Sequence, residues 1–411
     1  MTHPVPNRRL VIFILGSLAT VSPFAIDMYL PAFSQIAAGL GVSTAKISLS
    51  ISSYFAGLAA GQLFYGPLLD RFGRKPPLYA GLLLFAVAAL LCTVSRSADW
   101  LIAMRFFQAV GGCSAAVAAM AMVRDFFPVH ETARIISMLI LILGVSPLLA
   151  PTVGGFVALH WGWQWVFIIL ALVAFANIAL LFWLLPEGHL PDPNISLHPR
   201  PIFRNFAVVL KNAQFLTFSL SGAFALSGLL TYVTGSSIIF MEVFHVDGRT
   251  FSLLFAGLAV GAIGSNQINI WLLRSFSSEQ IFRTALLVEC PATLLFVVGS
   301  YYGWFGLGTT FALLFISLTS VGIACPNAAA LALMPIEENI GSASAMMGFL
   351  QIAVSFIASS TIGILNSHGI LPVAVIFGAT SWIALAIYWL GRRSNSGRSM
   401  GSAAESAGLI S

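Results

Sequence analysis

Long apolar runs separated by short polar segments dominate this chain of 411 residues. A helix needs about 20 consecutive apolar residues to cross the hydrocarbon core of a membrane, so each run of about this length predicts one spanning helix. Such runs lie at about Leu10–Ile26, Ile47–Leu69, Pro77–Val94, Ala98–Met122, Ile135–Leu159, Trp165–Leu185, Phe215–Phe240, Thr250–Leu273, Ile281–Ser300, Leu307–Leu331, Gly341–Leu365 and Leu371–Leu390. The pattern therefore predicts an all-α membrane protein with twelve spans.

One longer polar segment, at residues 186–211, divides these runs into two groups of six. It contains five prolines, and proline at this density interrupts helices, so we predict a central loop. The expected organisation is an N-terminal six-helix bundle at 1–185, the loop, a C-terminal bundle at 212–391 and a polar tail at 392–411. The two bundles are expected to be pseudo-symmetric.

Composition supports the membrane assignment and excludes several classes. Hydrophobic residues make up 58% of the chain and charged residues only 8%, whereas soluble domains carry roughly 25% charged residues. This excludes a soluble enzyme, a nucleic-acid binder and a disordered chain. The four cysteines lie singly, with no metal-binding spacing, so we predict no metal site and no cofactor. The sequence also lacks the HExxH, GxSxG and GxxxxGK[ST] motifs, so we predict neither an enzyme nor ATP hydrolysis.

The lysines and arginines of the loops predict the orientation, because cytoplasmic loops of membrane proteins are enriched in these residues. One side of the predicted membrane holds Arg8, Arg9, Arg71, Arg74, Lys75, Arg124, Arg134, Arg200, Arg204, Lys211, Arg274, Arg283, Arg392, Arg393 and Arg398, and the other holds Lys46, Arg96 and Arg249. We therefore expect both termini and the central loop to be cytoplasmic.

A dense motif occupies the turn between the second and third spans, at residues 66–76. Positive loop charge alone explains its basic residues, Arg71, Arg74 and Lys75, but not Asp70 among them. Asp70 can accept hydrogen bonds from the N-terminus of a neighbouring helix or from an arginine. Two glycines complete the motif: Gly66, which permits close helix approach, and Gly73, at the turn. We predict a latch that holds helix ends together in one conformation and releases them in another.

Two further motifs lie within spans. Arg105 is the only basic residue deep inside a predicted span, and an ionisable residue at that depth is by default functional, although a pair that locks two helices together is an alternative. The fifth span contains Pro147 and Pro151, which bend a helix, and the adjacent Gly154 and Gly155, which let another helix pack closely. An ordinary kinked membrane helix would show the same spacing.

Together these motifs resemble those of the major facilitator superfamily, and finer features resemble its Bcr/CflA subfamily of drug:proton antiporters. The finer features are Asp27-Met-Tyr29-Leu-Pro31, Arg124-Asp125, Trp161-Gly-Trp163-Gln-Trp165, Cys325-Pro326-Asn327 and Gly341-Ser-Ala-Ser344. The first half carries the resemblance more strongly than the second, which lacks the Asp-Arg-x-Gly-Arg pattern in its corresponding loop. The resemblance implies two bundles that alternate access to a central cavity, a monomer, and export of antibiotics of the chloramphenicol or bicyclomycin type. It also implies a gating role for residues 66–75 with Arg124 and Asp125, and a leak-control role for the fifth-span motif.

A proton-driven exporter needs an acid within the membrane whose protonation responds to its surroundings. Asp27 is the first choice, because at about 1.5 Å per residue it lies at a depth similar to that of Arg105 on the antiparallel fourth span. We expect Arg105 to favour the ionised form of Asp27 in one state and to separate from it in the other. An interfacial cap near Pro31 is the alternative for Asp27. Glu289, in the ninth span, has either a structural or a transport role.

Candidate substrate contacts are aromatic and amide side chains on the spans that line the cavity in the superfamily. They are Tyr29, Tyr54, Phe55, Gln108, Tyr232, Asn327, Phe349 and Gln351. Such side chains suit variable hydrophobic ligands, but lipid-facing or packing roles are an alternative for the aromatic residues.

We predict a multi-pass protein of a bacterial inner membrane that exports lipophilic small molecules in exchange for protons. Its partners would be the drug, protons and the lipid bilayer, with no nucleic acid. One alternative is an exporter of a natural metabolite, such as an amino acid, a nucleoside or a siderophore. Another is a membrane receptor that does not transport.

Overall fold

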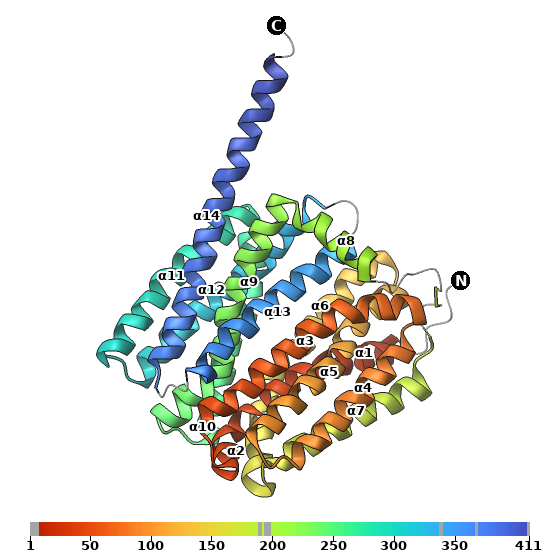
Figure 1. Cartoon of the computed structure of the whole chain (residues 1–411), viewed down its shortest axis with the longest axis vertical. Coiled ribbons are helices and arrows are strands. Elements are labelled where there is room, and N and C mark those ends of the chain that lie inside the picture. The colour runs from red at the N-terminus through yellow and green to blue at the C-terminus, as the bar shows by residue number, and fades with distance from the viewer. Residues whose placement is uncertain (1–7, 188–190, 193–198, 337–339, 366–368, 409–411) are drawn as a thin grey trace. The chain divides into compact units, whose positions relative to one another are not determined.

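The computed structural model describes residues 8–187, 191–192, 199–336, 340–365 and 369–408 (Figure 1). Twelve of its helices are long and apolar enough to cross a membrane, which confirms the predicted number of spans. They are α1 (Arg8–Asp27), α3 (Thr44–Phe72), α4 (Lys75–Thr93), α5 (Ala98–Phe126), α6 (Val129–Trp161), α7 (Gln164–Leu184), α9 (Ala213–Ser237), α10 (Gly248–Leu272), α11 (Ser278–Tyr302), α12 (Leu307–Leu333), α13 (Ile340–Ile364) and α14 (Leu371–Gly408). The described residues form no strand.

The first span ends in a break that the apolar pattern did not resolve. After α1, a short 3₁₀ helix, η1 (Leu30–Ala32), contains Pro31, and α2 (Phe33–Leu40) follows it. Proline lacks a backbone donor, which accounts for the interruption of the helix here. The break places the end of α1, at Asp27, inside the protein instead of at its surface.

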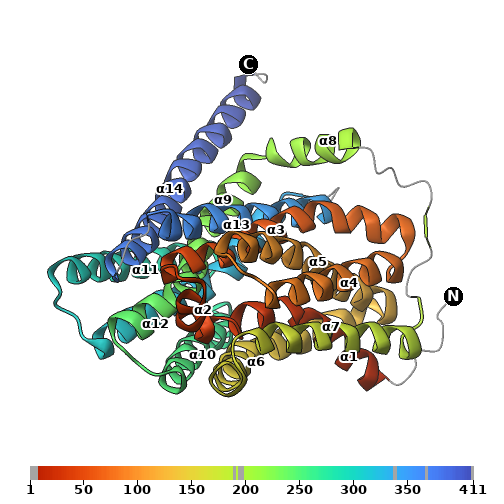
Figure 2. The same ribbon diagram turned by 60° about the horizontal axis from the view of Figure 1, so that its bottom comes forward.

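The central polar segment is not entirely a loop, which corrects the sequence-based expectation. It contains α8 (Pro199–Leu210), whose two prolines fall in its first turn, where an unbonded backbone nitrogen costs nothing. A turn at residues 211–212 separates α8 from α9 (Figure 2), and Asn212 Oδ1 accepts a hydrogen bond from the Phe215 N–H at 2.9 Å. At the other end of the chain, α14 continues through the polar tail to Gly408.

The chain forms two compact units that do not follow chain order throughout. The first unit comprises residues Met1–His198, Tyr232–Val260 and Phe356–Val373, and the second comprises Pro199–Thr231, Gly261–Ser355 and Ala374–Ser411. Parts of α9, α10 and α13 thus belong with the first six spans. The predicted division at the central loop stays a prediction.

Small residues allow the helices of the first unit to pack almost backbone to backbone. A Cβ added at Gly57 of α3 would overlap the Phe106 carbonyl oxygen of α5. A Cβ at Gly111 of α5 would lie 2.5 Å from the Gly81 carbonyl oxygen of α4. Close approach of this kind replaces hydrophobic burial as the basis of helix association in a membrane.

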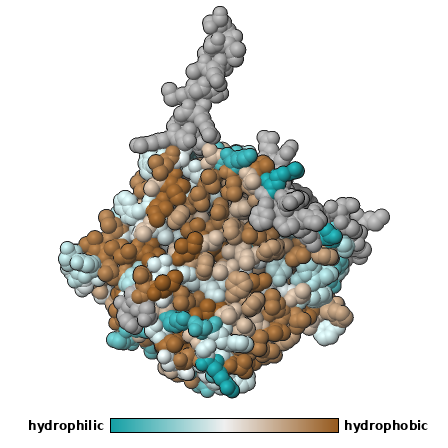
Figure 3. Space-filling model, in the orientation of Figure 1, coloured by the Kyte–Doolittle hydropathy of each residue, from teal (hydrophilic) through white to brown (hydrophobic). Residues whose placement is uncertain are grey.

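The surface of the molecule is apolar, as a lipid environment requires. Brown, hydrophobic residues cover most of the face shown in Figure 3. Large side chains such as Leu141, Phe182 and Trp183 expose more than two thirds of their area. A contiguous apolar surface of this extent is typical of a membrane protein.

Candidate functional site

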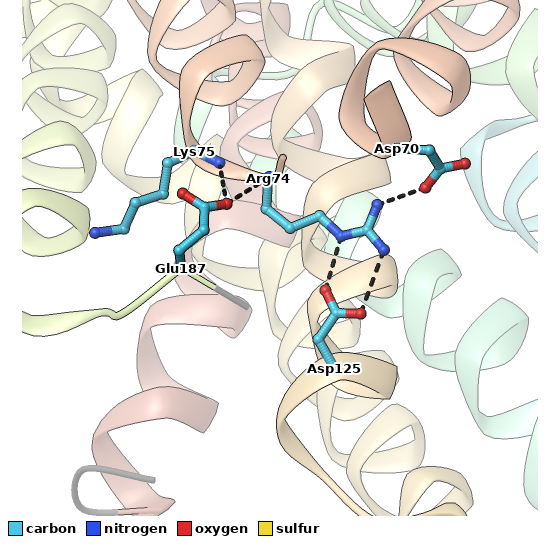
Figure 4. A network of polar contacts seen from close by, with 5 residues as sticks. All are labelled: Asp70, Arg74, Lys75, Asp125 and Glu187. Carbon is cyan, nitrogen blue, oxygen red and sulfur yellow. Dashed lines mark hydrogen bonds and ion pairs between the residues drawn. The ribbon is translucent and has the colours of Figure 1, made fainter. Parts of the chain in front are cut away.

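The predicted turn motif forms a network of polar contacts at one end of the first unit (Figure 4). Gly73, with φ of 83°, ends α3 in a backbone conformation that favours glycine, and Arg74 follows directly. The Arg74 guanidinium bonds Asp125 at the end of α5 through two nitrogens, with Nε–Oδ2 and Nη2–Oδ1 distances of 2.7 and 3.2 Å. Its third nitrogen bonds Asp70 Oδ1 at 2.6 Å. Asp70 therefore pairs with an arginine, one of its two predicted partners.

Electrostatics favour a permanently charged Arg74. Burial by itself lowers the pKa of Arg74, but the hydrogen bonds and charges of Asp125 and Asp70 outweigh burial and raise that pKa above its ordinary value. The side chains of Arg74 and Asp125 are only 9% and 10% exposed, whereas that of Asp70 is 50% exposed. The Arg74–Asp125 pair is accordingly the main contact of the network.

Glu187 completes the network, and the sequence analysis missed it. Its Oε1 accepts hydrogen bonds from the backbone nitrogens of Arg74 at 2.6 Å and Lys75 at 3.1 Å. These nitrogens belong to the start of α4, where a helix has free donors and a partial positive charge. The sequence did contain one signal for this role: Glu187 is an acidic residue that closely follows the sixth span, on the same predicted side of the membrane as the turn motif at residues 66–76.

Arg71, Arg124 and Gly66 are further predicted gating residues of this region. The Arg71 guanidinium lies over the Phe72 ring, 5.8 Å from its centroid, and Arg124 is exposed. A Cβ at Gly66 would meet no atom of the described residues within 4 Å, so the close approach expected there is not observed. Their roles in gating stay predictions.

Arg105 lies at the centre of the first unit in a cage of aromatic rings. Its guanidinium carbon is 4.3 Å from the Tyr54 ring centroid, 4.8 Å from that of Tyr29 and 5.9 Å from that of Phe167. Its nitrogens donate to Gln108 Oε1 at 2.7 Å and to the Ala25 carbonyl oxygen at 3.1 Å. Ring faces attract a cation, so they offset part of the cost of burying this fully enclosed charge.

Asp27 is buried at the end of α1 and forms no ion pair among the described residues. Ser146 Oγ of α6 donates to Asp27 Oδ2 at 3.4 Å. Arg105 reaches the carbonyl of Ala25, two residues earlier, and within the described residues it forms no salt bridge with Asp27. Arg105 thus contacts the backbone at the end of α1 but forms no ion pair with the Asp27 side chain, and their coupling stays a prediction.

Most of the predicted substrate residues are buried. Within the first unit, Tyr29 accepts a hydrogen bond from Ser50 Oγ at 3.0 Å, and the Tyr232 ring stacks on Phe255 with centroids 5.8 Å apart. Tyr54, Phe55 and Gln108 are also enclosed there. Within the second unit, Asn327 Nδ2 donates to Asn269 Oδ1 at 2.6 Å, whereas Phe349 and Gln351 are partly exposed.

The paired glycines of α6 differ in their surroundings. A Cβ at Gly154 would overlap the Met28 carbonyl oxygen, so α6 can pack against this end of α1 only with glycine at that position. A Cβ at Gly155 would lie 3.5 Å from Pro31 Cβ, which is ordinary contact. Pro147 and Pro151 both lie inside α6.

A second set of contacts lies at the opposite end of α3 from Arg74, also within the first unit. Thr44 Oγ1, at the start of α3, donates to Glu242 Oε1 of η2 (Ile238–Val243), a π-helical segment that follows α9. Ser237 Oγ donates to the Leu30 carbonyl oxygen at 2.8 Å. These bonds join residues about 200 positions apart, and no sequence pattern indicated them. Among the described residues no cluster of acids, histidines or cysteines could hold a metal ion.

The fold, the turn network and the α6 motif define a membrane transporter of twelve helices. Residues 15–362 match the family model of the Major Facilitator Superfamily, and the chain belongs to this superfamily. Within it, the chain groups with the Bcr/CflA subfamily. It is a multi-pass membrane protein.

Relatives and solved structures agree with this assignment. The chain is 30% identical to the Bicyclomycin resistance protein homolog of Haemophilus influenzae, over 92% of this chain and 95% of that protein. It is 30% identical to the Multidrug resistance protein MdtL of an Escherichia coli strain, over 84% and 86% of the two chains. In fold it is similar to a D-xylose-proton symporter, with a TM-score of 0.74 at 14% identity, over 93% of this chain and 97% of that one. It is also similar to a bacterial homolog of the human lysosomal transporter Spinster, with a TM-score of 0.71 at 16% identity, over 95% and 98%.

Proposed function

We propose that this protein exports lipophilic drugs from the bacterial cytoplasm in exchange for protons, by alternating access. The observation that carries the proposal is Asp27, an acid buried at the end of α1, two residues after the carbonyl of Ala25 to which Arg105 donates, and not paired with Arg105. The names of the relatives, which refer to bicyclomycin and multidrug resistance, support drugs as the substrate class. The protein would lie in the inner membrane with both termini cytoplasmic, and would act as a monomer.

Asp27 would carry the proton in this mechanism. A carboxylate without a cation is costly inside a membrane, so Asp27 takes up a proton when it is enclosed and releases it when water or a cation reaches it. Arg105 would supply that cation in another state of the transporter. Substrate would bind among the surrounding aromatic and amide side chains, and its arrival would favour release of the proton.

Two sets of contacts would control access. The Arg74 network ties together the ends of α3, α4 and α5 on the proposed cytoplasmic side. The Glu242–Thr44 contact ties η2 to α3 at the opposite end. Alternating access needs two ends that open at different times, and each end holds polar contacts that can be exchanged for water.

Proton flux in proteoliposomes tests the proposal. Vesicles with an acidic, dye-loaded lumen would receive bicyclomycin, chloramphenicol or a panel of lipophilic drugs from outside, and we expect wild type to raise the lumen pH as drug enters and protons leave. Asp27→Asn should abolish the drug-induced pH change. Asp99→Asn, which alters an exposed acid paired with Lys46 at 2.7 Å, is the matched control and should leave it intact.

Two results would contradict the proposal. Normal coupling in Asp27→Asn would exclude Asp27 as the proton carrier. Absence of any pH change in wild type, with drug still bound by the purified protein, would favour a carrier of a natural metabolite or a transporter without proton coupling.

A further inference from the structure

The second unit encloses an acid for which the proposed transport mechanism has no use. Glu289 lies in the middle of α11 and is completely buried. Its neighbours with titratable or polar groups are Cys290 on the same helix, Cys325 on α12 and Ser381 on α14. Within the described residues no lysine, arginine or histidine forms an ion pair with it. A negative charge at this position would therefore have no compensating cation.

The hydrogen bonds of Ser381 indicate where a proton would reside. Glu289 Oε1 and Ser381 Oγ are 2.6 Å apart, and Ser381 Oγ also lies 2.9 Å from the carbonyl oxygen of Phe377, one turn earlier in α14. A hydroxyl has a single hydrogen to donate, although its oxygen can accept. Serine side chains inside helices commonly donate to the carbonyl four residues earlier, which here is that of Phe377. When Ser381 donates in this way, its short contact with Glu289 requires that the acid be the donor.

The unpaired second oxygen of Glu289 leads to the same conclusion. Glu289 Oε2 is buried and has no hydrogen-bond partner among the described residues. In an ionised side chain this atom would be a charged oxygen without a donor, which is among the least favourable arrangements in a protein interior. In a neutral acid whose proton sits on Oε1, Oε2 is only a carbonyl oxygen, and its lack of a partner costs far less.

We propose that Glu289 is a second proton-binding site of the protein, in which a neutral carboxylic acid donates to Ser381 and so joins α11 to α14. Cys290 Sγ supports the same junction by donating to the Ser381 carbonyl oxygen at 3.4 Å. The proton stays on Glu289 throughout, because enclosure is complete and no lysine, arginine or histidine of the described residues pairs with this acid. This assignment needs no transport substrate and stands apart from the proposed function.

One consequence does rest on the proposed function. If drugs are exchanged for protons, the proton on Asp27 is exchanged and the proton on Glu289 is not. The Glu289 proton then does not count toward the number of protons moved for each drug.

Infrared difference spectroscopy of the full-length protein in liposomes tests the bound proton directly. The spectrum of wild type minus Glu289→Gln at neutral pH should contain the C=O band of a protonated carboxylic acid. Ser381→Ala, which keeps the acid but removes its partner, should shift that band. Carboxylate bands in its place, or a band unaffected by Ser381→Ala, would overturn the proposal. If Glu289→Gln does not fold, the same comparison uses two differences: wild type minus Glu289→Asp, and Ser381→Ala minus Ser381→Ala/Glu289→Asp.

A transport measurement provides the second test. Glu289→Gln resembles the neutral acid in shape and polarity, so drug-induced proton flux should persist, whereas Glu289→Ala should lower the thermal stability of the second unit. Loss of proton coupling in Glu289→Gln, with drug binding retained, would identify Glu289 as an exchanging site and refute the permanent proton. If wild type moves no protons with any drug, the proposed function fails, and the infrared test still decides the protonation of Glu289.

Discussion

Removal of the Arg74 guanidinium should destabilise the first unit by about 3–4 kcal/mol. Arg74→Ala leaves Asp125 with a buried, unpaired carboxylate, and breaking a buried ion pair from one side costs about 3–5 kcal/mol. The cost should lie in the lower half of this range, because the side chains of Arg74 and Asp125, at the ends of their helices, are still about a tenth exposed. The pair with the half-exposed Asp70 adds less than about 1 kcal/mol.

Variants of the two acids that bind the Arg74 guanidinium measure the contribution of each contact separately. Asp125→Asn should cost about 3 kcal/mol, because it removes the buried partner, and Asp70→Asn less than about 1 kcal/mol, because water already reaches that carboxylate. The double variant Arg74→Ala/Asp125→Asn should be less than additive, since each single change breaks the same pair. Asp99→Asn, an exposed acid paired with Lys46, should change stability by no more than about 1 kcal/mol.

Reversible unfolding in mixed micelles, with the free energy of unfolding extrapolated to zero denaturant, provides these values. Equal costs for Asp70→Asn and Asp125→Asn would show that burial does not set the strength of the network. A cost below about 1 kcal/mol for Arg74→Ala would show that the contacts hold no appreciable energy and could not act as a latch.

Three further predictions concern other positions. Gly154→Ala should prevent correct packing of α6, so that size-exclusion chromatography detects no folded protein. Gly155→Ala, where the added Cβ makes an ordinary 3.5 Å contact, should yield normal protein. Equal behaviour of the two variants would contradict the observed packing. Glu242→Gln or Thr44→Val should loosen the end opposite the Arg74 network and raise labelling of a nearby reporter cysteine by a membrane-impermeant maleimide severalfold, and unchanged labelling would argue against a closing contact. Hydrogen bonds from the Thr250 side chain and backbone lower the pKa of Asp247, so the ionised side chain stabilises the fold above the ordinary aspartate pKa of about 4, and this stabilisation is lost as the pH falls through the lowered value. The thermal unfolding temperature should therefore fall less steeply with acid in Asp247→Asn than in wild type. Parallel curves of unfolding temperature against pH would refute this.

The sequence predicted the spans well because hydrocarbon thickness constrains every run of residues in the same way. It also placed Asp70 among basic residues, which made an arginine one of its two predicted partners. It could not identify Glu187 as the acid that binds the start of α4, since that contact depends on how the chain returns after α7. Nor could it find Glu242, which lies at the end of an apolar run and reaches a residue about 200 positions away.

The Asp27–Arg105 hypothesis shows a second limit of sequence reasoning. Counting residues along two antiparallel spans gives depth in the membrane, but it does not give the face of each helix. Depth placed the two side chains at one level, and in the structure Arg105 donates to the carbonyl of Ala25 in the last turn of α1. Its guanidinium nevertheless faces Tyr54 and Tyr29, because the ring faces and the Ala25 carbonyl lie on that side.

The backbone-to-backbone fit of α3, α4 and α5 also determines where this protein can acquire new specificity. Any side chain larger than hydrogen at Gly57 or Gly111 would separate helices that now touch, so a lineage under selection by a new drug has no viable variants at these positions. The aromatic side chains around Arg105, such as Tyr54, are attached to the same rigid frame, and exchange of one aromatic ring for another keeps a ring face toward the guanidinium. Mutant libraries for altered drug resistance should therefore vary these side chains and leave the glycines fixed.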